Sequence, residues 1–135
     1  MDNAYYFAFA AILAVISILL VFKKNVDKLK ENPEEYGNIQ TKFFIGVAIA
    51  ETIPLILIVF GLMNASPASS MEDLYIPGAI VIFSMIFAAF FIFLQRSVGV
   101  PEESKQKVTH FSMLVLMLIN AIPIVSLVGL FMMMP

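Results

Sequence analysis

Glu51 carries the most distinctive chemistry of the sequence. Within the long apolar stretches of the chain, it is the only side chain other than tyrosine that can ionise. Hydrocarbon favours the neutral acid, whereas an ionised carboxylate there needs water or a cationic partner. Glu51 is therefore a candidate reversible carrier of one proton or one sodium ion. The alternative is a structural glutamic acid that is hydrogen-bonded inside a helix bundle.

The residues next to Glu51 suit an ion site. Thr52 adds a hydroxyl, and Ala48 is small enough to let another helix come close. Pro54 has no N–H to donate to the carbonyl of Ala50. We therefore expect this carbonyl to be free for a water, an ion or a side chain. The predicted ion-binding residues are Glu51, Thr52, Ala48 and Pro54.

Four apolar stretches must position these residues. Each is about 20 residues long, which is the length of a helix that crosses about 30 Å of hydrocarbon. Strands that span a membrane would be shorter and would alternate in polarity. The sequence therefore predicts an all-α membrane protein with transmembrane helices over residues 4–22, 43–63, 75–94 and 111–134.

Composition excludes several other classes of protein. Of the 135 residues, 61% are hydrophobic and only 13% are charged, which is atypical of a soluble domain. A net charge of −2 gives no attraction for a phosphate backbone, so we expect no nucleic-acid partner. With one histidine and no cysteine, a zinc site is not expected, and we predict no metal and no organic cofactor.

The basic residues predict the topology. All eight lie in the two polar segments 23–42 and 95–110. Basic loops stay on the cytoplasmic side, so we expect both termini to lie outside. The first stretch has no basic residue before it and no clear cleavage site, and we expect it to be retained as a span.

The two halves of the chain resemble each other. Residues 50–55 read Ala-Glu-Thr-Ile-Pro-Leu, and residues 119–124 read Ile-Asn-Ala-Ile-Pro-Ile. Each polar segment also contains Pro-Glu-Glu. We therefore predict two tandem helical hairpins, with these parts: the first hairpin over residues 1–64, an outside loop over 65–74 and the second hairpin over 75–135.

In the second hairpin, Asn120 and Pro123 occupy the places of Glu51 and Pro54. An amide donates and accepts hydrogen bonds but takes up no proton near neutral pH. We therefore expect each chain to carry one ion on four helices.

The stretch from the polar segment to Pro54 resembles the c subunit, or proteolipid, of rotary ATP synthases. In that family a loop with an Arg-Gln-Pro motif precedes a helix that reads Gly-X-Ala-X-X-Glu. Here the loop has Glu31-Asn32-Pro33, and residues 46–54 read Gly-Val-Ala-Ile-Ala-Glu-Thr-Ile-Pro. Bacterial proton-type members often have proline three residues after the carboxylate, as here. The doubled chain resembles the four-helix proteolipids of V-type ATPases.

This resemblance implies an ion-translocating protein that catalyses nothing alone. It implies a homo-oligomeric or mixed ring in the lipid bilayer, in a prokaryotic plasma membrane. Glu51 would pass the membrane arginine of a stator subunit, and the loop residues Asn32, Pro33 and Glu34 would contact a central stalk. Sodium-type rings usually add a glutamine from the first helix and a tyrosine after the carboxylate. Neither is present at the matching positions, which favours protons.

Two other hypotheses stay open. Small multidrug resistance transporters also have four short helices and one membrane glutamate, although theirs is in the first helix. A c-like accessory or assembly protein that transports nothing is the other. This hypothesis is motivated by the first helix, which lacks the family's glycine stripe. When the helix is aligned with the family by the loop proline, its small residues Ala8, Ala10 and Ala14 do not fall at the stripe positions.

Overall fold

The computed structural model describes residues 3–135, and this part of the chain is helical without any strand. Three short 3-10 turns separate the longer helices. In chain order the elements are α1 (Ala4–Glu31), η1 (Pro33–Glu35), α2 (Tyr36–Ala50), α3 (Thr52–Met63), η2 (Met71–Leu74), α4 (Tyr75–Ser97), η3 (Glu102–Ser104), α5 (Lys105–Ile119) and α6 (Ala121–Met132).

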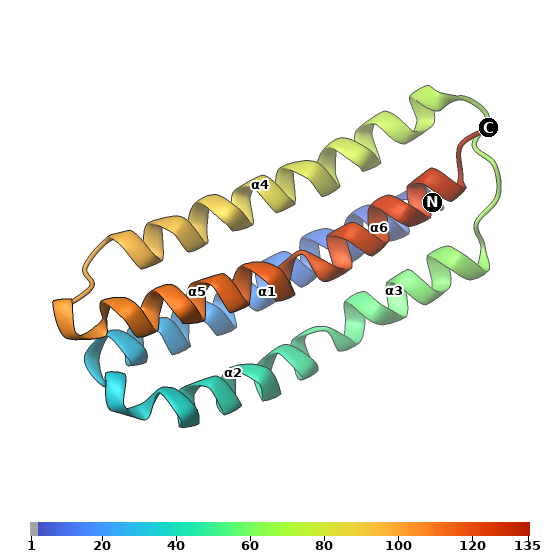
Figure 1. Cartoon of the computed structure of the whole chain (residues 1–135). Helices are drawn as coiled ribbons and strands as arrows, with labels where there is room; N and C mark the ends of the chain where they lie inside the picture. The colour runs from blue at the N-terminus through green and yellow to red at the C-terminus, as the bar shows by residue number, and fades with distance from the viewer. Residues whose placement is uncertain (1–2) are drawn as a thin grey trace.

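Four rods of helix result, because α2 continues into α3 and α5 continues into α6 (Figure 1). Each rod, together with its leading turn, is long and apolar enough to cross a membrane. The prediction of an all-α membrane protein with four spanning helices is confirmed. The helices also run past the apolar stretches, and α1 continues through the basic residues to Glu31.

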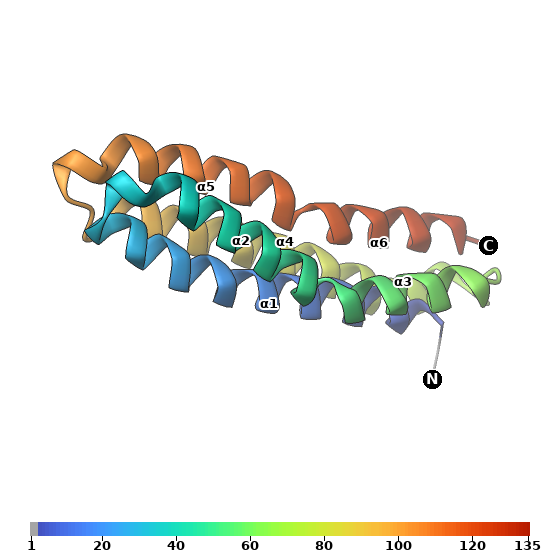
Figure 2. The same cartoon turned by 90° about the horizontal axis from the view of Figure 1, so that it is seen from below.

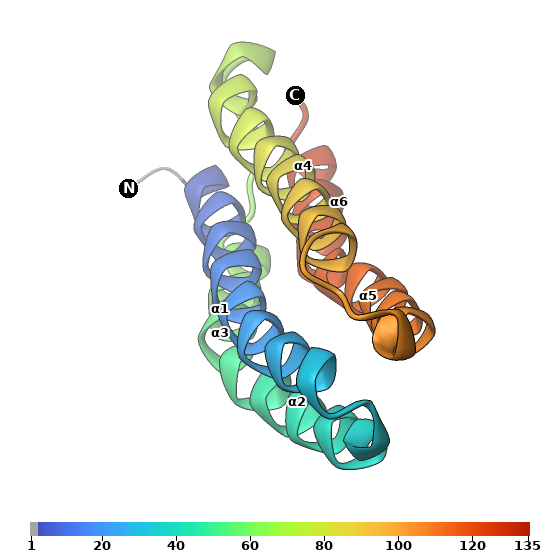
Figure 3. The same cartoon turned by 90° about the vertical axis from the view of Figure 1, so that its left-hand side faces the viewer.

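The rods form two hairpins that lie side by side (Figure 3). The first hairpin consists of α1 with α2 and α3, and the second consists of α4 with α5 and α6. The turns at residues 32–35 and 98–104 lie at one end of the bundle, which we call the loop end. The start of α1, the C-terminus and the connection over residues 64–74 lie at the other, the terminal end (Figure 1).

Helix α1 is the centre of the bundle and packs against all the other α-helices. Its small residues Ala8, Ala10, Ala11 and Ala14 are fully buried. Small side chains let helices approach closely in a membrane, where van der Waals packing replaces the hydrophobic effect as the driving force. The first helix therefore has a small-residue surface after all, made of alanines instead of glycines.

Phe7 of α1 is the tightest contact in this packing. Its ring is fully buried against two glycines, Gly61 of α3 and Gly129 of α6. A Cβ atom at Gly61 would lie 2.9 Å from the ring, and one at Gly129 would lie closer still. The two glycines thus make room for one aromatic side chain that joins both hairpins.

Hydrogen bonds tie the two hairpins together at the loop end. The Lys30 ammonium donates to the carbonyl of Val98 at 3.0 Å, and the Ser104 hydroxyl donates to the carbonyl of Lys30 at 2.8 Å. The Lys107 ammonium donates to the carbonyl of Pro33 at 2.9 Å. The loop ends of the two hairpins are therefore held as one unit.

The contact at Phe7 can be tested with two alanine substitutions. Gly129→Ala forces a methyl group against the buried ring and should cost about 1–3 kcal/mol of stability, the usual range for overpacking. Gly78→Ala is the matched control, because nothing lies within 4 Å of the added Cβ. Thermal unfolding in detergent should show a lower Tm for Gly129→Ala only. Equal Tm values for both variants would contradict the packing described here.

Candidate ion-binding site

Glu51 lies at an interruption of the second rod. Helix α2 ends at Ala50 and α3 begins at Thr52, and Glu51 between them has φ −81° and ψ −7°. Pro54 explains the interruption, since it has no N–H for the carbonyl of Ala50 and its ring crowds that carbonyl. The regular helix resumes at once, because the Leu55 N–H donates to the carbonyl of Glu51 at 2.9 Å.

The fourth rod repeats this interruption. Helix α5 ends at Ile119 and α6 begins at Ala121 (Figure 2). Asn120 between them has φ −83° and ψ −8°. Pro123 stands three residues later, as Pro54 does after Glu51. The helices before the interruptions both have 15 residues, and those after them both have 12. The structural repeat is thus in register at the two polar residues.

The four residues predicted around the ion do not all face the same way. Glu51 is half-buried, and Pro54, three residues on, is buried on the same side of the rod. Ala48 and Thr52 are exposed. The Thr52 hydroxyl donates to the carbonyl of Ala48 at 3.2 Å, so its proton is used within its own helix. The structure therefore brings Glu51 and Pro54 together and turns the Thr52 side chain away.

No cation of the described chain neutralises Glu51. Within residues 3–135, the only ion pair joins Lys23 to Asp27 at 3.0 Å, near the loop end. An isolated carboxyl group in hydrocarbon is stable as the neutral acid, and it loses its proton only when water or a cation reaches it. Within residues 3–135, Glu51 therefore has no charged partner.

Asn120 differs from Glu51 in its hydrogen bonding. Its side-chain Nδ2 donates to the carbonyl of Leu116 at 2.9 Å, one turn earlier in the same rod. The amide is half-buried, and Pro123 is buried. Asn120 thus satisfies a donor within its own helix and has no proton to exchange near neutral pH.

The predicted stalk-contact residues lie far from this site. Asn32 and Glu34 are exposed and Pro33 is partly exposed, all at the loop end. Helix α2 has 15 residues between this turn and Glu51, which at 1.5 Å per residue corresponds to roughly 22 Å. The structure therefore keeps the loop residues and the carboxylate as two separate sites.

Two buried hydroxyls were not anticipated from the sequence. The Oγ atoms of Ser112 and Ser126 are buried and have no hydrogen-bond partner within residues 3–135. A single serine in an apolar helix has no neighbouring pattern that would mark it, so the sequence offered no signal for either. Both lie on the second hairpin, away from Glu51 in the chain.

Comparison with known proteins points to one family. Residues 4–64 match the sequence model of the ATP synthase c-subunit family. The ATP synthase c subunit of Alkalihalobacillus alcalophilus is 37% identical over 54 residues, which cover 40% of this chain and 76% of that protein. The ATP synthase c subunit of Halalkalibacterium halodurans is 38% identical over 50 residues, 37% of this chain and 71% of that protein. No solved structure matches the chain significantly.

The interruption at Glu51 predicts a weakly bonded carbonyl at Ala50. Pro54→Ala supplies an N–H at position 54, so the carbonyl of Ala50 should gain a helical hydrogen bond. With a carbon-13, oxygen-18 label on that carbonyl, its infrared amide I band should move to lower frequency in Pro54→Ala. Pro123→Ala is the control and should leave this band in place. A band that does not move in Pro54→Ala would show that the proline is not the cause.

Proposed function

Because the chain belongs to the ATP synthase c-subunit family, we propose that it is a proteolipid of the rotor ring of a rotary ATPase and carries one proton per chain on Glu51. The observation that carries this proposal is the half-buried carboxyl group of Glu51, which has no cationic partner within the described chain. Alone, the protein catalyses no reaction, and it serves as a component of the complex.

The carboxyl group moves its proton through contact with another protein of the complex. While Glu51 faces lipid or another helix, it stays neutral and can be carried through hydrocarbon. A membrane arginine of a stator subunit favours the ionised form while the two side chains are close, so the proton leaves there and another is taken up afterwards. Each charge that crosses the membrane potential is worth about 2.3 kcal/mol per 100 mV.

The second hairpin contributes structure without a second proton. Asn120 sits at the same interruption as Glu51 and bonds to its own helix. It passes the stator as a permanently neutral group. A ring of such chains therefore moves one proton for every four helices, which means fewer ions per turn and suits pumping against a steep gradient.

The loop end is the side that meets the rest of the complex. All eight basic residues lie at or near it, which favours a cytoplasmic position in a prokaryotic plasma membrane. Exposed Asn32 and Glu34, with Pro33 between them, are available to a central stalk. The hydrogen bonds between the two loop ends give the stalk one rigid surface per chain.

Of the two other hypotheses, the multidrug transporter rested on the count of four helices and one glutamate, whereas the family match covers the residues around Glu51 and favours the proposal. The c-like accessory protein differs from the proposal in one respect only. In an accessory protein Glu51 would exchange no proton, and Glu51→Gln would leave proton pumping by the complex unchanged.

Carbodiimide labelling tests the proton site. Dicyclohexylcarbodiimide reacts with protonated carboxyl groups that it reaches from hydrocarbon. We expect it to modify Glu51 in intact membranes at low pH and to react more slowly as the pH rises, because the neutral acid is then depleted. Mass spectrometry of the purified chain should place the adduct at Glu51, and Glu51→Gln should abolish it.

Two controls accompany this labelling. Glu72→Gln removes an exposed carboxylate at the terminal end and should leave the adduct unchanged. Sodium chloride should not slow the reaction, whereas protection by sodium would identify Glu51 as a sodium carrier. An unlabelled Glu51 in membranes whose complex pumps protons would refute the proposal.

The one-proton stoichiometry gives a separate prediction. The native chain should accept one carbodiimide adduct, because Asn120 cannot react. Asn120→Glu places a second carboxyl group at the equivalent interruption, and we expect two adducts per chain by intact-mass measurement. Asn120→Gln has nearly the same size and should accept one. A single adduct on Asn120→Glu would mean that the two interruptions are not equivalent environments.

A further inference from the structure

A hollow near the loop end of the second hairpin joins apolar walls to an unsatisfied hydroxyl group. It has a volume of about 200 Å³ and lies between α4 and α5. Ser112 and Leu116 of α5 line it on one side, and Ala89, Phe93 and Arg96 of α4 line it on the other. The Ser112 side chain is fully buried, and its Oγ has no hydrogen-bond partner within residues 3–135.

The Ser112 hydroxyl differs from the serine hydroxyl on the neighbouring helix. Ser84 of α4 donates to the carbonyl of Val81 at 2.7 Å and is thus satisfied within its own helix. Ser112 makes no such bond. A buried donor without an acceptor costs free energy, so this hydroxyl favours a ligand that places an oxygen atom in the hollow.

The internal repeat shows how the hollow arises. Ser112 stands eight residues before Asn120, and Phe43 stands eight residues before Glu51. Phe43 is fully buried, and its ring lies edge-on to that of Phe111 with the centroids 5.1 Å apart. A benzyl group therefore fills this place in the first hairpin. The second hairpin has the smaller hydroxymethyl group of Ser112 there, which leaves space and supplies a hydrogen-bond donor.

Arg96 adds a positive charge to the exposed edge of the hollow. It belongs to the last turn of α4, and its guanidinium lies over the Phe93 ring, 5.7 Å from the centroid. No carboxylate pairs with Arg96 in the described chain, since the one ion pair there joins Lys23 to Asp27. The guanidinium is therefore available to an anion at the membrane surface.

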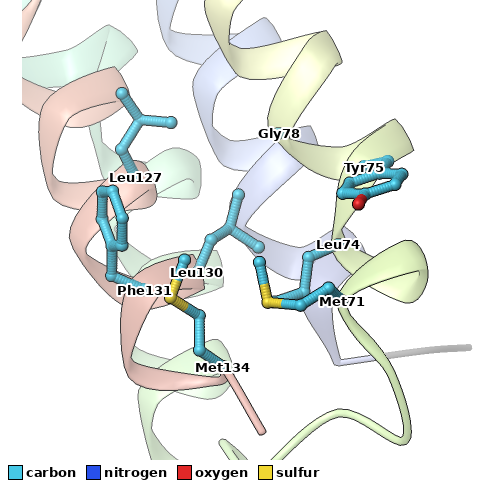
Figure 4. Close-up of a pocket in the computed structure, with 8 residues that line it drawn as sticks. All are labelled: Met71, Leu74, Tyr75, Gly78, Leu127, Leu130, Phe131 and Met134. Atoms are coloured by element: carbon cyan, nitrogen blue, oxygen red, sulfur yellow. The ribbon is translucent and has the colours of Figure 1, made fainter.

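A second hollow of the same hairpin lacks both polar groups. It has a volume of about 140 Å³, lies between α4 and α6 at the terminal end and is lined by apolar side chains and Tyr75 (Figure 4). Its lining within the described chain includes neither a charged side chain nor a buried hydroxyl without a partner. Of these two hollows, only the one at the loop end combines a cation with a free donor.

We propose that the loop-end hollow binds one anionic phospholipid, phosphatidylglycerol, from the leaflet that surrounds the loop end. The phosphate lies against the Arg96 guanidinium, and an ester carbonyl accepts a hydrogen bond from Ser112. One acyl chain continues along Leu116, one helical turn farther from the loop end. This site is independent of the proposed function, because it requires no proton on Glu51.

A phospholipid satisfies both polar groups, which an apolar helix face would leave unpaired. Its phosphodiester is anionic and accepts paired hydrogen bonds from a guanidinium. Its ester carbonyls accept hydrogen bonds without donating any, as a lone hydroxyl donor requires. Basic pockets between membrane helices are known to bind anionic headgroups in this way. The charge and the free donor thus select the lipid class, and the apolar walls suit its chain.

Native mass spectrometry of the purified protein tests this site with two lipids. The protein in detergent is titrated with phosphatidylglycerol, or with phosphatidylcholine that has the same acyl chains. We expect one phosphatidylglycerol per chain to be bound at least about tenfold more tightly than phosphatidylcholine, since a hydrogen bond to a charged group is worth about this factor. Equal binding of the two lipids would overturn the proposal, because it would report an unspecific lipid shell.

Arg96→Gln should reduce the binding of phosphatidylglycerol to the level of phosphatidylcholine. Lys28→Gln is the matched control, since Lys28 is exposed and stands five residues before the proline of its turn, as Arg96 does. It removes the same charge away from the hollow and should leave binding unchanged. If both variants weaken binding equally, net charge alone attracts the lipid and the site is refuted.

Substitutions at Ser112 test the hollow itself. Ser112→Phe supplies the benzyl group found at this place in the first hairpin, so it should fill the hollow and abolish the bound lipid. Ser112→Ala keeps the space and removes only the donor, which should weaken binding about two- to tenfold. Ala89→Leu fills the hollow from α4 and replaces Ser112→Phe if that variant does not fold. Unchanged binding of phosphatidylglycerol to a filled variant would overturn the proposal.

Discussion

The rule that backbone polar groups must be paired in hydrocarbon governs this structure. It leaves the helix as the one form that these four apolar stretches can take. The rule is broken in the middle of two stretches, where Pro54 and Pro123 withhold an N–H from the preceding turn. Both breaks lie at the residue with a carboxyl or amide side chain in its stretch, Glu51 or Asn120. Each proline therefore interrupts its rod at the position of this polar residue.

Packing around α1 turns these rods into one body. Its buried alanines allow close approach, and the ring of Phe7 fills the space that Gly61 and Gly129 leave. At the loop end, lysine and serine side chains join the two hairpins through backbone carbonyls. This arrangement leaves Glu51 half-buried on a rod that packs mainly against α1. Glu51 and the exposed loop residues, the proposed ion site and the proposed stalk surface, are thus separated along the chain.

Much of the site was predictable from the sequence, whereas the packing was not. The position of Glu51 and the break before Pro54 follow from residue types and spacing. Ile18 and Ile86 show the limit of this reasoning, since they are the same residue at the same distance from a proline, yet only Ile18 is buried. Lipid and protein interiors are both apolar, so no sequence pattern distinguishes a residue that faces one from a residue that faces the other. Likewise, nothing in the sequence showed that the Thr52 hydroxyl would bond to Ala48.

By itself, the sequence determined four membrane-spanning helices, the repeat and its two interruptions, and the single carboxyl group in the apolar stretches. These features depend on hydropathy, length and proline geometry, which act locally along the chain. Only the tertiary structure decided that α1 occupies the centre and that Phe7 fits against two glycines. Those features depend on the shapes that meet when helices pack. In a membrane, close fit decides which apolar faces meet, because the hydrophobic effect does not separate one apolar face from another.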